Sequence, residues 1–587
     1  MSHPSAEYLM LRYFTNMKDI DQGFQGSGVS RESLKFFMAL EQGQGVRDVK
    51  ILALDRFISR FGRLAAHAAL AGALACSAFS TSGTERPPAT ADHSKFEALQ
   101  GPFENAQAVT EACLGCHTEA GEQVRATTHW TWTYEHPETG QTLGKSKVIN
   151  SFCGMAITNE PRCTSCHVGY GWEDMKQPPP TADNAVDCLV CHDTTGDYWK
   201  FPTLAGHPTY TPREWPKGSG NMVQPPDLEM IAQNVGASGR ANCGSCHFYG
   251  GGADGVKHGD LDSSLVDPPS SLDVHMSPDG LDFACADCHT SWGHQVAGSR
   301  YQVNAADTQG IDVPGHTDLS RASCQSCHGD SPHPQQKLND HVDTLACQTC
   351  HVPEFARGGV PTKVWWDWST AGRLDEHGQP ITEYDEHGHP SYLSEKGDFR
   401  HGENVVPTYA WFNGTVKYTL VDEELDVAHP PVEINRIEGS PEDPGSRIWP
   451  FKVMQGKQPY DTERKTLLAT HVFGADDSSL WSNFSWPKAL KAGSELSGMP
   501  FSGSYDFIET TMHWPITHMV PPAEMALNCA SCHASNSRLA GLPGIYMPGH
   551  SSNIWLDRIG WLLVAMTLIG VVLHGLARIL LKGRVKS

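Results

Sequence analysis

The sequence repeats one five-residue pattern, Cys-x-x-Cys-His, eight times along its 587 residues. This is the attachment motif of haem c: the two thiols bond covalently to the haem vinyl groups, and the histidine binds the iron from one side. We number the motifs 1 to 8 in chain order. The predicted attachment residues are Cys113, Cys116, Cys163, Cys166, Cys188, Cys191, Cys243, Cys246, Cys285, Cys288, Cys324, Cys327, Cys347, Cys350, Cys529 and Cys532. The predicted proximal iron ligands are His117, His167, His192, His247, His289, His328, His351 and His533.

Zinc ribbons and a disulfide framework are the two other structures that use closely spaced cysteines. A zinc ribbon does not require a histidine directly after each second cysteine, and all eight motifs have one. A disulfide framework does not favour eight identical spacings. Both explanations are therefore weaker than eight covalently bound haems.

The number of haems limits the architecture. Between residues 95 and 550 there are roughly 57 residues per haem, too few for an ordinary apolar core around each. We therefore expect the haems to supply much of the buried surface. The predicted fold is mainly α with long ordered loops and little sheet, a multihaem cytochrome c domain at residues 91–550 built round a chain of eight haems. The 56 glycines and 39 prolines suit a loop-rich chain.

The 177 residues between motifs 7 and 8 contain no cysteine. We expect this region to cover haems and to bind little itself, although it could supply a supporting residue such as His471. The stretch VVPTYAWFNGTVKYTLVD suggests a β-hairpin with its turn at Asn413-Gly414.

The start of the chain resembles an export signal, which covalent haem attachment outside the bacterial cytoplasm requires. Residues 64–79 form an apolar run rich in small residues, and three arginines precede it. Cleavage after an Ala-x-Ala site at Ala73–Ala75 is one outcome, and a retained anchor is the other. We therefore assign residues 64–90 to a signal-peptide-like segment and linker. Residues 1–63 are either a cytoplasmic segment or the product of a misassigned start codon.

The end of the chain predicts a transmembrane helix at residues 559–581. Residues 559–577 carry no formal charge and span about 28 Å as a helix, enough for the bilayer core. The basic residues that follow predict a cytoplasmic tail, and hence a periplasmic haem domain tethered to the bacterial cytoplasmic membrane. His574 lies inside this helix. It either contacts a membrane cytochrome b or another quinol-oxidising partner, or is a neutral histidine near the helix end.

The region between these terminal segments is strongly acidic. Residues 64–557 hold 30 basic and 60 acidic side chains, a net charge of −30. This charge argues against nucleic acid as a partner. It suits a basic redox partner or simple solubility.

An electron-transferring haem usually has a second histidine on the distal side of its iron. Of the 30 histidines, 22 lie outside the motifs. Seven of these lie near motifs in regular local contexts and are the predicted distal ligands: His129, His275, His294, His316, His333, His341 and His518. These are seven candidates for eight haems, and five further histidines could also serve: His207, His258, His471, His513 and His550.

Five stretches resemble the tetrathionate reductase family of octahaem c-type cytochromes. They are NEPRCTSCHVGYGW, DCLVCHDTTG, GGADGVKHGDLDSSL, DHVDTLACQTCHVPEFARGG and WPITHMVPPAEMALNCASCH, and the resemblance covers about residues 100 to 550. It implies that the haem on motif 2 is the active site, with the amine of Lys257 as its distal ligand. It also implies that Cys153, ten residues before that motif, lies near the active iron and close to Lys257.

The resemblance implies a reductase of tetrathionate, with nitrite and hydroxylamine as alternative substrates. A thiol at Cys153 could exchange with a sulfur–sulfur bond if it were exposed and partly ionised, which slightly favours a sulfur substrate. Two other functions stay open. One is a non-catalytic electron conduit with all eight haems saturated, and the other is hydroxylamine oxidation. The sequence also leaves open whether calcium is bound.

Overall fold

The structure is a computed structural model, and it describes residues 91–216, 218–303, 322–474, 476–534, 536–545 and 553–582. The chain divides into two compact units, residues 1–82 and 83–587. The predicted segments 1–63 and 64–90 and the predicted ligand His316 lie outside the described residues. All elements below belong to the second unit.

The helices that carry the motifs are one or two turns long. A helical turn brings residues i, i+3 and i+4 to one side, which lets the two cysteines and the histidine of a motif hold one haem. Helices this short are unstable alone, so they depend on packing. Up to motif 7 the α-helices are α4 (Ala106–Leu114), α5 (Ala120–Arg125), α6 (Thr128–Thr131), α7 (Leu189–His192), α8 (Leu228–Gln233), α9 (Arg240–His247), α10 (Cys285–Cys288), α11 (Gln325–His328), α12 (Gln336–Asn339) and α13 (Cys347–His351).

Motif 2 differs from the others because its cysteines lie in a 3₁₀ helix, η4 (Cys163–Cys166), and not in or beside an α-helix. The other described 3₁₀ helices are η1 (His93–Lys95), η2 (Glu97–Leu99), η3 (Ala156–Thr158), η5 (Asp183–Ala185), η6 (Ser263–Leu265), η7 (Trp368–Thr370) and η8 (Ala523–Met525).

The expectation of a mainly α fold with little sheet is wrong for the region between motifs 7 and 8. A nine-stranded sheet lies there, in the order β13-β17-β15-β7-β10-β9-β8, with β11 and β16 also paired to β15. Its strands are β7 (Thr362–Asp367), β8 (Thr382–Tyr384), β9 (Pro390–Leu393), β10 (Gly397–Gly402), β11 (Thr408–Phe412), β13 (Val432–Glu433), β15 (Arg447–Asp461), β16 (Thr466–Leu467) and β17 (Tyr505–Pro515).

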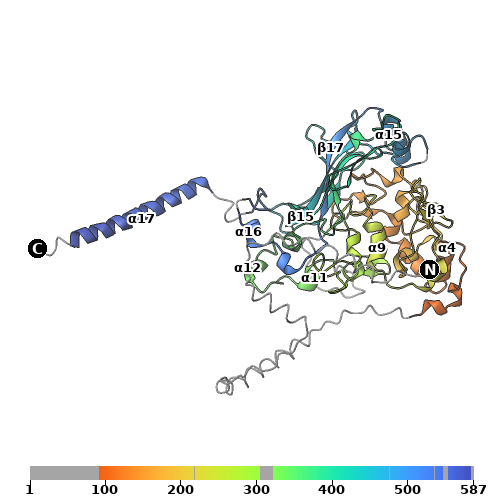
Figure 1. Ribbon diagram of the computed structural model, residues 1–587, viewed down its shortest axis with the longest axis horizontal. Coiled ribbons are helices and arrows are strands. Elements are labelled where there is room, and N and C mark those ends of the chain that lie inside the picture. Colours follow the sequence, from red (N-terminus) through yellow and green to blue (C-terminus); the bar gives the residue numbers. More distant parts are fainter. Residues whose placement is uncertain are drawn as a thin grey trace, which may run out of the picture. The chain divides into compact units, whose positions relative to one another are not determined.

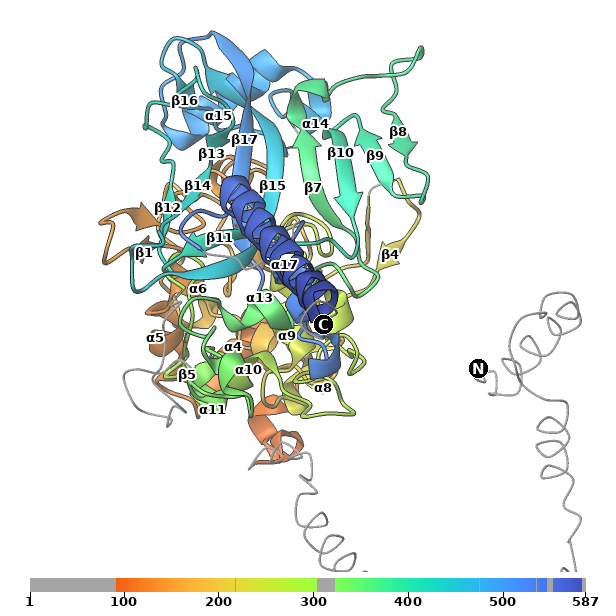
Figure 2. The same cartoon turned by 90° about the vertical axis from the view of Figure 1, so that its left-hand side faces the viewer.

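The physical reason is that this region has no haem motif and must build its core from its own side chains. Its largest cluster of buried residues includes Trp366, Phe412, Phe451, Met454 and Trp514, each at most 2% exposed. Figures 1 and 2 show β15 and β17 on one side of this unit and the short helices that carry motifs on the other.

The two long strands organise the sheet. β15 and β17 are antiparallel over eleven residue pairs, from Phe451 opposite Pro515 to Asp461 opposite Tyr505. On its other side β15 runs parallel to β7, with Gln455 opposite Trp365. Because β15 is paired on both sides, most of its side chains are buried.

The predicted hairpin at Asn413-Gly414 is also wrong. Both strands form, but they pair elsewhere: β11 with β15, and β12 (Val416–Tyr418) with β14 (Asn435–Ile437). The turn dipeptide gives a local bend, and partners distant in sequence offer more buried surface than the neighbouring strand. The remaining two-stranded pairs are β1 (Tyr134–Glu135) with β2 (Thr142–Leu143), β3 (Arg213–Glu214) with β4 (Met222–Val223), and β5 (Ser291–Trp292) with β6 (Gln295–Val296).

Three further helices complete the described haem-binding part: α14 (Leu480–Asn483), α15 (Trp486–Ser497) and α16 (Cys529–Cys532), which carries motif 8. α15 packs against η3, the segment that leads into motif 2. Nearby, Nδ1 of the buried His471 lies 2.6 Å from the carbonyl oxygen of Thr158 in η3. His471 therefore supports the approach to motif 2.

The C-terminal helix α17 (Ile554–Lys582) is 29 residues long and begins five residues before the predicted transmembrane segment. Residues Ile554–Leu581 have a mean hydropathy of 2.1 in their most apolar window, and that window is 0% buried. Its length and composition are enough to span a membrane.

Candidate haem centres and active site

At motifs 4 to 8 the structure brings the ring of each motif histidine close to the ring of one of the predicted distal histidines. Two metal–nitrogen bonds of roughly 2 Å on opposite sides of one metal place the centres of two imidazole rings roughly 6 Å apart. The five ring-centre distances are 5.8–6.4 Å. The pairs are His247 with His129, His289 with His518, His328 with His275, His351 with His333, and His533 with His341. This spacing fits one haem iron between each pair, and ligation itself stays a prediction.

The hydrogen bonds of several predicted ligands leave the same ring nitrogen available. In six predicted ligands Nδ1 lies within hydrogen-bond distance of a protein oxygen, so Nε2 is free to face a metal. The Nδ1 partners are Gly236 O for His192 (2.8 Å), Ala297 O for His289 (3.0 Å), Gln123 Oε1 for His294 (2.9 Å), Asn339 Oδ1 for His333 (3.2 Å), Lys337 O for His341 (2.7 Å) and Asp260 Oδ2 for His518 (3.1 Å).

Motifs 1 and 3 have one described candidate between them. His294 lies near both His192 and His117, which lower its pKa after the larger effect of burial. The second candidate that the sequence provides for these motifs, His316, is outside the described residues.

Cysteines of different motifs also lie side by side, which gives the order of the haem centres. Motifs 1 and 3, 4 and 5, and 6 and 7 each bring their first cysteines within hydrogen-bond distance. Weaker electrostatic contacts link motifs 3 and 4, 5 and 6, and 7 and 8. Motif 2 joins this series beside motif 4, through Cys166 and Cys246. It is therefore a branch of the series.

His167, the histidine of motif 2, has different surroundings from the histidines of motifs 4 to 8. Its ring centre lies 4.7, 5.5 and 4.8 Å from the rings of Trp130, Trp132 and Trp172. Nε2 is 2.8 Å from the carbonyl oxygen of Trp130, and the buried Nδ1 has no hydrogen-bond partner among the described residues. Burial lowers the pKa of His167 to about 3. A neutral ring that donates from Nε2 keeps a lone pair on Nδ1, which can bind a metal.

Lys257 lies on the Cys166 side of motif 2. Its Nζ is 4.8 Å from the ring centre of Trp514. Lys257 is also one of the groups that lower the pKa of the Cys166 thiol. Burial lowers the pKa of Lys257 well below its usual value, and the nearby cations Arg300 and Lys145 lower it further. An amine must be neutral to bind a metal, so these surroundings fit the role that the family resemblance assigns to Lys257.

Two glycines shape the loop that carries Lys257. Gly255 and Gly259 have φ angles of +65° and +86°, which disfavour residues with a Cβ. A Cβ on Gly255 would lie 2.8 Å from the side chain of Val360, and one on Gly259 would lie 2.8 Å from that of Phe355. The loop therefore turns sharply on both sides of Lys257 and packs tightly against its neighbours.

Two cations lie close to Lys257. The guanidinium of Arg300 is 5.8 Å from the ring of Trp514, the same ring that contacts Lys257. Lys145 Nζ lies 3.4 Å from the carbonyl oxygen of Cys163. The groups that shift the pKa of Lys257 are these two cations and Cys166, with no carboxylate among them. The site therefore carries an excess of positive charge that would attract an anion.

Cys153 lies near Cys163, the first cysteine of motif 2, and contributes to the raised pKa of its thiol after the larger effect of burial. The groups around it are Lys396, Arg162 and Lys363, whereas those around Lys257 are different residues. Burial raises the pKa of the Cys153 thiol, against the opposing effect of the three cations. A neutral thiol is a weak nucleophile, so the structure does not favour the predicted thiol exchange.

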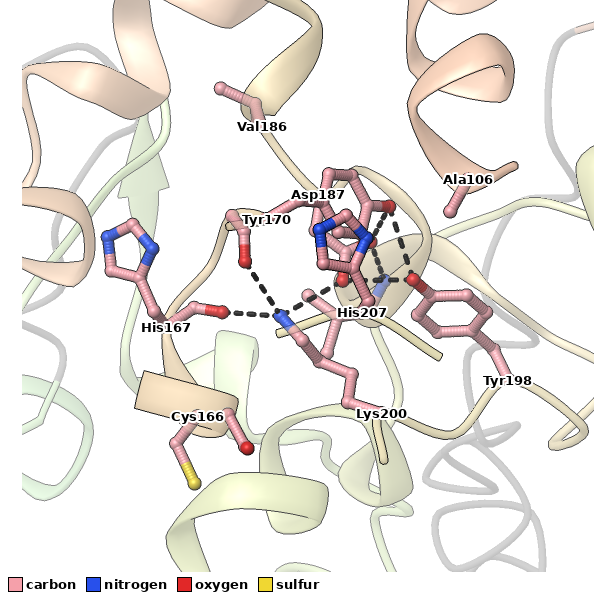
Figure 3. Close-up of polar contacts among 12 residues, drawn as sticks. Ala106, Cys166, His167, Tyr170, Val186, Asp187, Tyr198, Lys200 and His207 are labelled. Carbon is pink, nitrogen blue, oxygen red and sulfur yellow. Dashed lines mark hydrogen bonds and ion pairs between the residues drawn. The ribbon is translucent and has the colours of Figure 1, made fainter. Parts of the chain in front are cut away.

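A buried polar cluster that the sequence did not predict links motif 2 to motif 3 (Figure 3). Lys200 Nζ lies 3.1 Å from Asp187 Oδ2 and also donates to the carbonyl oxygen of His167. Asp187 Oδ1 accepts from Tyr170 Oη at 2.8 Å and from the backbone N of Val190, inside motif 3, at 3.1 Å. The cluster fixes the segment of His167 relative to the next motif. Its only sequence signal is an aspartate directly before Cys188.

Asp260 is a second residue that the sequence did not reveal. It is 1% exposed, and its Oδ2 accepts from the backbone N of Thr517 at 2.8 Å and of His518 at 3.0 Å. Against the lowering effect of burial, it raises the pKa of His518. Asp260 thus orients a predicted ligand of motif 5 from a position three residues after Lys257.

Eight attachment motifs, with histidines paired at the spacing of two axial ligands, define a multihaem c-type cytochrome. Residues 363–536 match a family model described as "Cytochrome c bacterial". The solved octaheme cytochrome c from Shewanella oneidensis is 40% identical, with a TM-score of 0.67, and the match covers 78% of this chain and 100% of that chain. The chain therefore belongs to the octahaem c-type cytochrome family, which confirms the family resemblance. An uncharacterized protein of Archaeoglobus fulgidus is 23% identical over 217 residues, 36% of this chain and 68% of that protein.

Membership of this family means that the chain carries covalently bound haem c and is an electron-transferring oxidoreductase. Its haem domain belongs outside the cytoplasm, and one apolar helix, α17, could span a membrane.

Proposed function

We propose that this chain is an octahaem reductase, tethered to the membrane by α17, that delivers electrons to a small anion bound at motif 2. The haem of that motif supplies the iron at which electrons leave the protein. The observation that carries the proposal is the positive charge of Arg300 and Lys145 close to the buried amine of Lys257 at this motif. Motifs 4 to 8 have histidine pairs in the corresponding place.

In this proposal Lys257 is the distal ligand of motif 2. A neutral amine is a weaker ligand than imidazole, so the substrate can displace it. Arg300 and Lys145 then hold the substrate's negative charge, and the walls formed by Trp514 and its neighbours limit access of water.

The family resemblance makes tetrathionate the first candidate substrate. Its reduction breaks the central sulfur–sulfur bond with two electrons and gives two thiosulfate anions, so no proton has to be supplied. The positive charge of the site also suits nitrite, and suits neutral hydroxylamine less well. Cys153 is not needed for this chemistry, in accord with the raised pKa of its thiol.

A non-catalytic electron conduit is the second candidate. The five histidine pairs favour it, because saturated haems transfer electrons without binding substrate. In either function, a quinol-oxidising membrane partner that contacts α17, such as a membrane cytochrome b, would supply the electrons.

The test is reductive turnover by the full-length protein in detergent, with a low-potential viologen donor and tetrathionate, nitrite or hydroxylamine as acceptor. The proposal expects turnover of an anion that falls about a hundredfold or more in Lys257→Ala, while Lys147→Ala, an exposed lysine, keeps wild-type turnover. Reoxidation of the viologen-reduced protein by none of the three acceptors would favour the conduit.

A further inference from the structure

Lys452 is a fully buried lysine in the middle of β15, with 0% of its surface exposed. Its Nζ lies 2.7 Å from the carbonyl oxygen of Val256, 2.9 Å from that of Lys257 and 2.6 Å from Thr362 Oγ1. Burial lowers the pKa of Lys452 well below its usual value, and the three acceptors satisfy the hydrogen bonds that its Nζ can donate. Burying a lysine in the interior of a sheet is costly unless it is hydrogen-bonded. The groups to which Lys452 donates therefore indicate which part of the chain it stabilises.

Thr362 of β7, also fully buried, belongs to the same hydrogen-bond network. Its hydroxyl donates to the carbonyl oxygen of Gly255 at 2.7 Å, which leaves its oxygen to accept from Lys452. The two side chains therefore bind the carbonyls of three consecutive residues, Gly255, Val256 and Lys257. The last of these three residues is the predicted distal ligand of motif 2.

The side-chain end of Lys257 contacts β17, the strand that pairs with β15 at Lys452. Lys452 pairs with Trp514 of β17 in the antiparallel register, and the ring of Trp514 lies 4.8 Å from Lys257 Nζ. One cross-strand pair thus binds both the backbone and the side-chain end of the same residue.

We propose that Lys452 is a positioning residue that, with Thr362, fixes the loop of Lys257 on the sheet and so controls how readily the amine leaves motif 2. The sheet between motifs 7 and 8 then has a role in the active site, although it carries no haem motif. Without the three carbonyl contacts the loop would gain freedom, and the amine would be displaced more easily by an incoming ligand. This inference rests on the proposed ligation of motif 2 by Lys257.

The test measures binding of cyanide to the oxidised full-length holoprotein, followed by visible and electron paramagnetic resonance spectra. We expect Lys452→Met to bind cyanide at motif 2 about tenfold faster than the wild type, because the buried hydrogen bonds that hold the loop are lost. Thr362→Val, which removes the hydroxyl and keeps the shape, should show a smaller change in the same direction. The matched control is Lys457→Met, the same substitution on the same strand at a half-buried lysine that faces Glu509.

Cyanide binding in Lys452→Met and Thr362→Val at the wild-type rate would overturn the positioning role. If Lys452→Met does not fold, Thr362→Val decides alone, because it removes one hydroxyl, keeps the shape of the side chain and leaves the two carbonyl contacts of Lys452 in place. Lys257→Ala tests the proposed ligation separately from the positioning role of Lys452 and Thr362. A Lys257→Ala variant that binds cyanide no faster than the wild type would overturn the proposed ligation. A fast Lys257→Ala variant beside slow Lys452→Met and Thr362→Val variants would overturn the positioning role alone. None of these measurements requires a known substrate.

Discussion

At motifs 4 to 8 the ring of each motif histidine faces a histidine from elsewhere in the chain at 5.8–6.4 Å, whereas the ring neighbours of His167 at motif 2 are three tryptophans. The pentapeptides are alike, so the attachment motif does not set the chemistry of the centre. What differs is the surroundings, which at motif 2 include Lys257, Lys145 and Arg300.

Buried lysines support motif 2 from two directions. Lys200 donates to the backbone carbonyl of His167, and Lys452 donates to that of Lys257. The two differ in charge compensation: Lys200 has Asp187 as its partner at 3.1 Å, while the Lys452 contacts are two carbonyls and a hydroxyl. Lys200 and its carboxylate partner thus hold the segment of His167, while Lys452 holds the loop of Lys257 through hydrogen bonds.

The largest expected effect comes from breaking the compensated pair. Lys200→Met removes a 7%-exposed ammonium and leaves Asp187, whose side chain is 0% exposed, without its charge partner. We expect a loss of about 3–5 kcal/mol in the free energy of unfolding, measured by urea denaturation of the holoprotein. The control is Lys488→Met, which breaks an ion pair between side chains that are 53% and 81% exposed, and should cost less than about 1 kcal/mol. Equal losses in the two variants would contradict a special role for the buried pair.

A smaller effect is expected from reducing the positive charge that distinguishes motif 2. Arg300→Gln should raise the KM for tetrathionate and nitrite about tenfold, because a charge-assisted contact is lost. The KM for neutral hydroxylamine should stay near its wild-type value. Arg300→Lys keeps the charge and should recover much of the anion affinity, although it loses the planar guanidinium. Steady-state kinetics with the three acceptors check this, and a uniform rise in all three KM values would show that Arg300 has only a structural role.

The sequence predicted the haem attachment sites because they are local: two cysteines and a histidine within one helical turn. It also predicted ten residues that the structure brings together in five ring pairs, such as His351 with His333. It failed for the sheet because the argument from haem density assumed an even spread of haems, and 177 residues have none. No local sequence pattern predicts the roles of Lys452 and Lys200. Both donate to backbone carbonyls that come close only when the chain is folded.

The smallest expected effect concerns a carboxyl that precedes motif 2 by three residues. Glu160 is half-buried, and its Oε2 has no hydrogen-bond partner among the described residues. Burial raises the pKa of Glu160 from 4.5 to about 7. The folded protein therefore keeps this proton at pH values where the unfolded chain has lost it, so the stabilising contribution is fully present below pH 4.5 and is lost as the pH rises to about 7. Because the side chain is partly exposed, the decrease should be about 1 kcal/mol. Glu160→Gln should remove this slope from urea unfolding measured at several pH values, whereas Glu173→Gln, at an exposed position, should retain it. A wild-type slope in Glu160→Gln would assign the pH dependence to other groups around motif 2.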